Sequence, residues 1–344
     1  CEDCPIRHRA VCSKCEGDEL EMLESIKSYR SYQPGEAIVW AGEKIQLTGS
    51  VVEGVAMLLR TLPDGRRQIQ WGHAARMETE AATEFRTAPL YAVYSSDGLN
   101  GCAVSFQRHL RDRIVTPTRP DRPVHYNCWE AVYFDHRLDV LQDIAARAAE
   151  LGAERFVLDD GWFGTRDDDT RALADWQVDP RKYPDGLGPL IDHVHDVGMS
   201  FGIWLEPEMI NPDSDTYRAH PDWALGYEDQ ILGRQQMCLD MSNPEVRDYL
   251  YDQFADLLSN NDIDYIKWDH NRVLPMPDAN QPSGTYALLD RIREVFPNVE
   301  IESCASGGGR IDFGILQRTQ RVWLSDSNDA LERLRIQHNA ALFL

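Results

Sequence analysis

The sequence predicts an α/β protein: an incomplete (β/α)₈ TIM-type barrel preceded by a small, mostly-β N-terminal region. Two observations predict the barrel. After residue 123, six strand-like segments alternate with helical or loop segments, as in a parallel sheet. Polar groups, many of them carboxylates, end nearly every strand, where barrel active sites are assembled. An open doubly wound sheet begins similarly, but no phosphate-binding glycine fingerprint follows the first strand, and CASGGGR follows the fifth strand without a Walker lysine.

The N-terminal region, residues 1–70, differs in composition from the rest. DELEMLESIKSY predicts a short amphipathic helix with Leu20, Leu23 and Ile26 on one face. EAIVWAGE and VVEGVAMLLRTLPDGRRQIQ predict strands, with Pro63 and Gly65 in a turn. The composition changes near Gln68 to Trp71.

Residues 71–122 are expected to hold the remnant of a β-sandwich and a linker. The weak alternation of 85–106 predicts two strands around an Asp97-Gly98 turn. Helical character follows in 105–114, and the proline-rich VTPTRPDRPV ends the region.

The barrel is predicted for residues 123–344. Its strands are expected in VHYNCWEA, RFVLDDGWF, MSFGIWLEPE, DYIKWDHN, VEIESCASGG and RVWLSDS. Helices are expected over 135–154, 187–198, 242–261, 284–295 and 330–344. Gly152 suits a left-handed C-terminal cap, and Ser242 with Glu245 predicts a capping box.

The charge balance bounds the partners. The 35 Lys and Arg against 57 Asp and Glu give −22, which opposes attraction to nucleic acid or to an anionic membrane. A neutral small molecule or carbohydrate fits better. The sequence contains no apolar run of membrane-spanning length and no basic-then-apolar leader, so we expect a cytoplasmic protein without a membrane partner. The oligomeric state stays open, a homo-oligomer included.

The chemistry is expected at the strand ends. Alternation places Lys267, Asp269 and Asn271 on one side of a strand, and Val322, Leu324 and Asp326 on one side of another. Two acids at the mouth of a barrel are what glycosidic bond cleavage requires. A single strand-end Asp is more often a cap or turn former. Here acids recur on strands two, four and six, near four tryptophans that suit sugars: Trp129, Trp162, Trp204 and Trp268.

Seven ordered motifs resemble the catalytic domain of glycoside hydrolase family thirty-six, the bacterial retaining α-galactosidases. They are NCWEAVYFD, LDDGWFG, FGIWLEPEMI, LDMSNPEVRDYL, DYIKWDHNR, ESCASGGGRIDFGIL and WLSDSNDALERLRIQ, within residues 80–344. The resemblance implies double displacement that releases terminal α-D-galactosyl residues from sugars such as melibiose and raffinose, without a cofactor. Asp269 would be the nucleophile, Asp326 the acid and then the base, and Asp329 a supporting contact. The family domain would be truncated at both ends, before the last two strands of the barrel.

The same resemblance implies the sugar contacts. Asp159, Asp160 and Lys267 would bind galactose hydroxyls, Trp129 and Trp204 would shape the pocket, and Arg234 would contact the sugar. Cys304 and Gly307 would leave close quarters for the 2-hydroxyl. Other roles stay open: Trp204 as core, Arg234 as a surface ion pair, Cys304 as a buried thiol. Glu206 and Glu208 rank as structural or supporting acids, and His270 as a neighbour without a role.

Residues 1–70 resemble instead the N-terminus of an Fnr-type regulator of the Crp and Fnr family. CEDCPIRHRAVCSKC resembles its cysteine cluster, and this implies an iron–sulfur site with Cys1, Cys4, Cys12 and Cys15 as ligands; zinc or unligated thiols are the alternatives. The chain would then be a chimera of two genes. The rival functions are a redox-sensing regulator fragment and an inactive chimeric product. A dimer helix and a helix-turn-helix are missing, so DNA binding is not expected.

Overall fold

The computed structural model describes Asp18 and residues 59–61, 67–69, 89, 91–275 and 280–341. The chain divides into two compact units, 1–73 and 74–344. In the first unit, β1 (Leu59–Thr61) pairs antiparallel with β2 (Arg67–Ile69), in line with the expected strands. The four N-terminal cysteines and the expected 18–29 helix and 36–43 strand lie outside the described residues, apart from Asp18.

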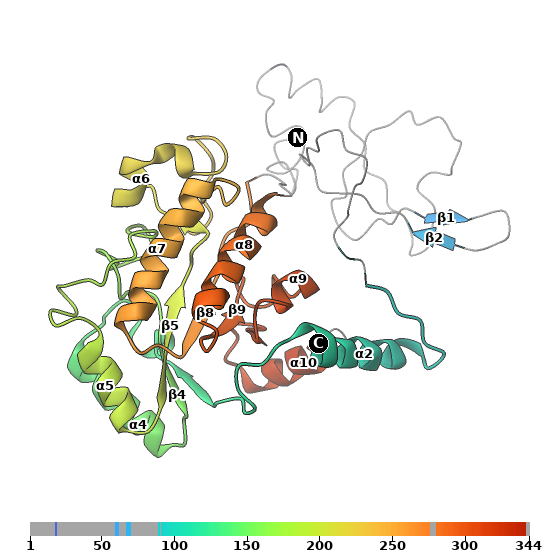
Figure 1. Cartoon of the computed structure of the whole chain (residues 1–344), viewed down its shortest axis with the longest axis horizontal. Helices are drawn as coiled ribbons and strands as arrows, with labels where there is room; N and C mark the ends of the chain where they lie inside the picture. The colour runs from blue at the N-terminus through green and yellow to red at the C-terminus, as the bar shows by residue number, and fades with distance from the viewer. Residues whose placement is uncertain are drawn as a thin grey trace. The chain divides into compact units, whose positions relative to one another are not determined.

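The second unit is built on a sheet of six parallel strands (Figure 1). Its order is β10-β9-β8-β5-β4-β3, so consecutive strands of the sheet lie next to each other. The strands are β3 (His125–Asn127), β4 (Arg155–Leu158), β5 (Ser200–Leu205), β8 (Tyr265–Trp268), β9 (Glu300–Ser303) and β10 (Arg321–Val322). This confirms the prediction of an α/β fold with part of a barrel.

The sheet is curled. Arg321 on β10 donates from Nη1 to the carbonyl oxygen of Pro123, just before β3, over 3.3 Å. Five strand spacings separate these strands, which would be about 24 Å in a flat sheet. The two edge strands therefore approach each other around a concave face.

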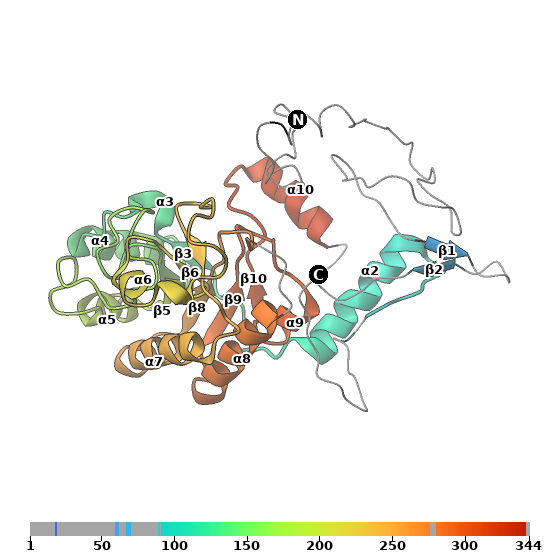
Figure 2. The same ribbon diagram turned by 90° about the horizontal axis from the view of Figure 1, so that it is seen from above.

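Helices lie between the strands along the chain. They are α3 (Trp129–Val132), α4 (Leu138–Glu150), α5 (Gly188–Asp196), α6 (Asp215–Ala219), α7 (Pro244–Asn260), α8 (Asn280–Val295) and α9 (Phe313–Leu316). Figures 1 and 2 show α7 beside α8, and these two helices are in contact. A small antiparallel pair, β6 (Met209–Ile210) and β7 (Met237–Cys238), follows β5, and α10 (Ala330–Ala340) ends the described chain. Among the described residues, no helix has the length and apolar character needed to cross a membrane.

Register assigns each strand residue to one of two faces. Phe156, Phe201, Ile266 and Ile301 are buried on the convex face, beneath the helices. The concave face carries Arg155, Tyr265, Glu300, Lys267 and Glu302 instead. Gly202 belongs to it too, because a Cβ there would lie 2.5 Å from the Tyr265 ring. A parallel sheet normally buries apolar side chains on both faces. The polar side chains on the concave face therefore indicate that this face forms a polar interior.

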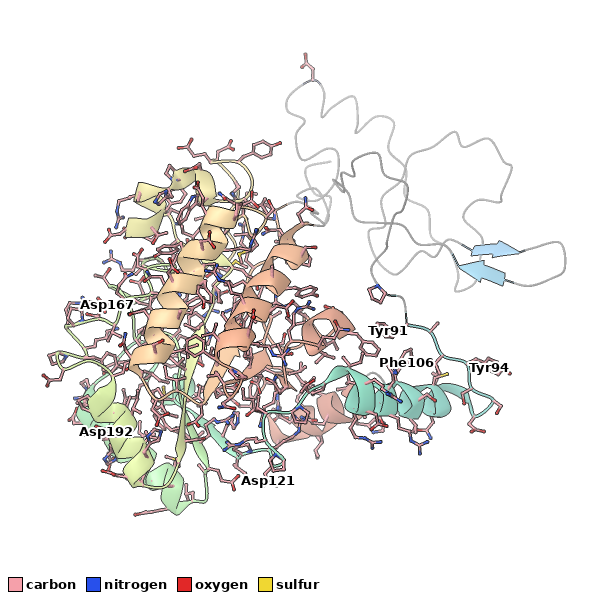
Figure 3. The ribbon with its side chains drawn as sticks, in the orientation of Figure 1. Tyr91, Tyr94, Phe106, Asp121, Asp167 and Asp192 are labelled. Atoms are coloured by element: carbon pink, nitrogen blue, oxygen red, sulfur yellow. The ribbon has the colours of Figure 1, made fainter. Side chains whose placement is uncertain are left out.

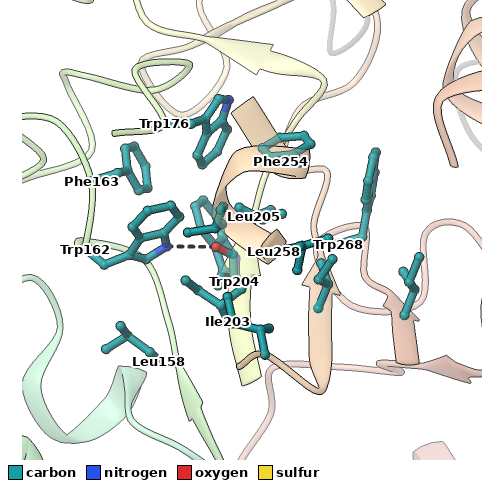
Figure 4. Packing of buried hydrophobic residues seen from close by; sticks show 14 of the residues in the cluster. Leu158, Trp162, Phe163, Trp176, Ile203, Trp204, Leu205, Phe254, Leu258 and Trp268 are labelled. Carbon is teal, nitrogen blue, oxygen red and sulfur yellow. Dashed lines mark hydrogen bonds between the residues drawn. The ribbon is translucent and has the colours of Figure 1, made fainter. Parts of the chain in front are cut away.

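Aromatic side chains fill the core above β5. Figure 4 shows Trp162, Phe163, Trp176 and Phe254 around Trp204. Trp162 donates from Nε1 to the Trp204 carbonyl oxygen over 3.0 Å, so this buried indole nitrogen is satisfied. The packing fixes the end of β5, which carries part of the site described below.

One strand expected near the start of this unit is wrong. The second of the two strands expected in 85–106 is replaced by α2 (Gly98–His109). The helical character expected in 105–114 is confirmed by the end of α2 and a π-helix (Leu110–Ile114), both of which carry basic residues in the last turn that favour helix C-termini. Of the first expected strand, the structure describes residues 89 and 91–96, and none of these is in a strand. Tyr91 and Phe106 pack on Phe313 of α9, with ring centroids 4.5 and 5.9 Å away, and Figure 3 places both beside α9. These apolar contacts favour the helix over the weak alternation.

The expected capping box of Ser242 and Glu245 is also wrong. The N-cap of α7 is Asn243, whose side chain accepts from the Glu245 backbone N–H. Ser242 donates its hydroxyl to Asp240 instead. Gly152, by contrast, has φ +94° after α4, as expected for a left-handed cap.

Candidate active site

The C-terminal ends of β4, β5, β8 and β9 bring together the polar side chains of the concave face. Asp159 follows β4, Trp204 is in β5, Lys267 is in β8 with Asp269 just beyond, and Cys304 follows β9. The backbone ladder extends past the strands, because Asp269 N–H donates to Leu205 O and Cys304 N–H to Trp268 O, each over 2.8 Å. These segments therefore hold their side chains on a rigid frame.

Asp269 is a buried carboxylate, 5% exposed, surrounded by donors. Oδ1 accepts from the His270 N–H over 2.8 Å, and Oδ2 accepts from Trp204 Nε1 over 3.1 Å and Asn271 Nδ2 over 2.7 Å. Burial alone would raise its pKa, but the charge of Lys267 and hydrogen bonds from Cys304, Asn271 and Trp204 outweigh burial and lower the pKa. Asp269 is therefore held as a carboxylate, the form in which it could act as a nucleophile.

Lys267 forms an ion pair with Asp159 and acts on Asp269 through its charge. Its Nζ lies 3.0 Å from Asp159 Oδ2, which also accepts from Asn127 Nδ2. Burial would lower the pKa of Lys267, but the charges of Asp159 and Asp269 raise it above its usual value. The ammonium group therefore stays charged between the ends of β4 and β8.

Asp326 is connected to the same lysine through Trp323. The Lys267 Nζ lies 5.8 Å from the centroid of the Trp323 ring, and Trp323 Nε1 donates to Asp326 Oδ1 over 2.7 Å. Asp326 is exposed while Asp269 is buried. The expected strand alternation of Val322, Leu324 and Asp326 is wrong, since β10 ends at Val322 and a loop carries Asp326.

The loop after β9 packs against that Asp326 loop. Gly307 has φ +86°, and a Cβ there would lie 2.9 Å from Ser325 Cα. The neighbouring Gly308 donates its N–H to Leu324 O over 3.0 Å. Only glycine fits this approach without strain, so Gly307 fixes the backbone one residue before Asp326.

Several expected sugar contacts are bound to other protein groups. Asp160 is buried in a bidentate ion pair with Arg166, at 2.9 and 2.8 Å. Trp204 is both core and site: its ring stacks 6.2 Å from Phe163 while its nitrogen reaches Asp269. The Cys304 thiol is buried, and burial followed by the charge of Asp269 raises its pKa, so it stays a donor.

Two other expected contacts are more exposed than these. Trp129 on α3 is half-buried, with Tyr133 and Phe134 packed edge-on against it. Arg234 is exposed in a two-residue turn, where Arg234 and Gln235 have φ +51° and +59° between the paired residues Gly233 and Gln236. Positive φ angles in such a turn normally belong to Asn or Gly, so the backbone at Arg234 and Gln235 is strained. Asp329 is the N-cap of α10 and accepts from Glu332 N–H.

Sequence reasoning missed Asn127 and Trp323, and it ranked both glutamates after β5 together. Strand parity could have placed Asn127 on the concave face, because it lies in register with Val157 beside Asp159. Glu208 fits the supporting rank, since it accepts from Trp268, Arg310 and Thr285. Among the residues that the structure describes, no group of His, Cys, Asp and Glu could hold a metal ion.

Known proteins are similar to this chain in architecture and in sequence. A family model described as Melibiase matches residues 84–344. An alpha-galactosidase of Escherichia coli is 52% identical over 296 residues, covering 81% of this chain and 41% of the relative. Two solved structures of GH36 alpha-galactosidase AgaA variants from Geobacillus stearothermophilus, in complex with stachyose and with raffinose, are 40% identical with TM-scores of 0.69. Each match covers 73% of this chain and 37% of the solved one, so the chain spans about two fifths of its relatives' length.

Proposed function

This chain belongs to the melibiase family, glycoside hydrolase family thirty-six, and from that premise we propose that it hydrolyses terminal α-D-galactosyl residues with retention of configuration. The observation that carries the proposal is Asp269, a buried carboxylate whose four donors and neighbouring lysine favour its ionised form. Sugars such as melibiose, raffinose and stachyose are the proposed substrates.

In the proposed reaction, Asp269 attacks the anomeric carbon and forms a covalent galactosyl ester. The bond to the leaving oxygen breaks, and Asp326 supplies the proton for that oxygen. Water then attacks the anomeric carbon, gives its proton to Asp326, and frees Asp269. The exposed position of Asp326 suits a group that meets both the leaving sugar and water.

Sugar recognition is proposed for the residues around this pair. Lys267 and Asp159 form a charged pair 3.0 Å apart that can exchange hydrogen bonds with two adjacent hydroxyls. Asp160 keeps its bond to Arg166 and can use its remaining lone pairs. Trp129, Arg234, Cys304 and Gly307 complete the proposed contacts. A sugar lacking the right hydroxyl would leave buried polar groups unpaired, which discriminates strongly.

A trapping experiment tests the nucleophile and the stereochemistry together. A fluorinated α-galactosyl fluoride should label the peptide that carries Asp269, as seen by mass spectrometry. In Asp326→Ala, added azide should attack the ester and yield α-galactosyl azide. A label on another peptide, or a β-azide from this variant, would contradict the assignment.

The fusion of residues 1–70 to the enzyme region stays a prediction. No observation on the described residues favours the iron–sulfur alternative, because Cys1, Cys4, Cys12 and Cys15 lie outside them. Sequencing genomic DNA across Gln68 to Trp71 in independent isolates tests the chimera, and a continuous gene would refute it.

A further inference from the structure

Glu206 lies beside Asp269 on the concave face. Trp204 pairs with Lys267 and Leu205 with Trp268, and the ladder continues through the bond from Asp269 N–H to Leu205 O. The next pair in register is therefore Glu206 and Asp269. Both side chains are buried, Glu206 completely.

The two carboxyl groups share one bridging residue, Asn271. Glu206 Oε1 accepts from the Asn271 backbone N–H and from Gln236 Nε2, the latter over 2.7 Å. The Asn271 side chain donates to Asp269 Oδ2 over 2.7 Å. Glu206 thus holds the backbone of the residue whose amide orients the nucleophile.

The other oxygen, Glu206 Oε2, is buried and has no hydrogen-bond partner among the described residues. An ionised carboxylate would leave a charged oxygen unsolvated there, which is costly. A protonated carboxyl group places its O–H on Oε2 and keeps Oε1 as the acceptor for both donors.

Three charged groups face Glu206: the Asp269 carboxylate favours its protonated form, whereas the two arginines oppose it. Asp269 comes from the end of β8, Arg166 from the loop after β4, and Arg234 from the turn before β7. Arg166 is already paired with Asp160, and Arg234 is exposed. Burial, followed by the charge of Asp269, raises the pKa of Glu206 to about 8.

We propose that Glu206 carries a proton in the active enzyme and is a positioning residue for Asp269, acting through Asn271. Loss of that proton in mildly alkaline solution places a second negative charge beside Asp269 and disturbs the aligned carboxylate. The role in catalysis rests on the proposed function, whereas the protonation state does not.

An infrared titration tests the protonation without turnover. The full chain should show the carbonyl band of a protonated carboxyl group at about pH 6, and the band should vanish with a midpoint near pH 8. Glu206→Gln should lack this band, and Glu208→Gln should keep it. In Asp269→Asn the midpoint should fall, because the charge that raises the pKa of Glu206 is gone.

The wild-type titration decides the point even if Glu206→Gln does not fold. Absence of the band at about pH 6, or a midpoint that Asp269→Asn leaves in place, would overturn the proposal. If the chain hydrolyses no galactoside yet the band titrates as described, the proposed function fails and the protonated Glu206 stands.

Kinetics test the positioning role. A dinitrophenyl α-galactoside needs no acid for its leaving group, so the pH profile of kcat/KM no longer depends on Asp326. The wild type should lose about tenfold in kcat/KM above the midpoint near pH 8. Glu206→Gln should keep the acid limb and lose this alkaline limb, while Glu208→Gln keeps both limbs and unfolds at a lower temperature. An alkaline limb that is identical in the wild type and Glu206→Gln would refute the role.

Discussion

Both ends of the six-stranded sheet bury charge on the concave face, but they use it differently. At the N-terminal end, Arg155 is 1% exposed, and its Nη1 lies 2.7 Å from Glu300 and 3.0 Å from His125, above the Tyr265 ring. At the C-terminal end, Asp269 is surrounded by hydrogen-bond donors and lies near Lys267, which is already paired with Asp159. The first arrangement satisfies the charge within the protein, and the second keeps ionised the carboxylate that we propose as the nucleophile. In barrels the first kind serves stability and the second serves chemistry.

The largest expected effect comes from the same isosteric change at each end. Asp269→Asn should lower kcat at least about a thousandfold, because an amide cannot form the galactosyl ester. Its unfolding midpoint in urea should stay near that of the wild type or rise. Glu300→Gln should show the reverse pattern, with kcat retained and stability lost. Equal losses of activity in both variants would contradict the assignment of stability to one end of the sheet and chemistry to the other.

Breaking the buried pair at the N-terminal end should cost less, and only in stability. Arg155→Met leaves Glu300 buried without its cation, which should cost about 3–5 kcal/mol in urea unfolding. Arg147→Met is the matched control, since Arg147 pairs with Asp143 on an exposed helix face and should lose only about 0.5 kcal/mol. The double variant Arg155→Met with Glu300→Leu should recover much of the loss. Similar costs for the two single variants would mean that burial does not matter here.

Lys267→Met should join the two effects at the C-terminal end. The positive charge lowers the pKa of Asp269, so its removal raises that pKa and moves the acid limb of kcat/KM to higher pH. We also expect kcat/KM to fall at least about tenfold at its optimum, since Asp159 loses its partner. An acid limb at an unchanged pH would show that Lys267 does not tune Asp269.

The smallest expected effect compares two glycines with nearly equal backbone angles. Gly307 and Gly198 have φ +86° and +85°, but a Cβ at Gly198 meets nothing within 4 Å. Gly198→Ala should therefore cost about 1 kcal/mol from backbone strain alone. Gly307→Ala should cost about 2 kcal/mol and lower kcat, because it pushes on the Ser325 backbone beside Asp326. Equal stability and activity in both variants would contradict the crowding.

Strand periodicity showed part of this site in advance. The alternation in 264–272 placed Lys267, Asp269 and Asn271 on one face. In the structure Asn271 donates to Asp269, and the charge of Lys267 lowers the pKa of Asp269. It could not show that Asp326 lies on a loop, because a two-residue strand leaves no period to read. It also could not separate Glu206 from Glu208, since their difference comes from partners on other strands and helices. Register between strands distant in sequence decides such contacts, and a single chain does not display it.

The pairing of Arg155 with Glu300 also has a kinetic consequence. The two residues are 145 positions apart, and β5 and β8 must be in place between β4 and β9 before they meet. Contacts of such long sequence separation close late in folding. Breaking this pair should thus leave the refolding rate almost unchanged and accelerate unfolding. The lifetime of the folded sheet therefore depends on an ion pair that forms only after the rate-limiting step of folding.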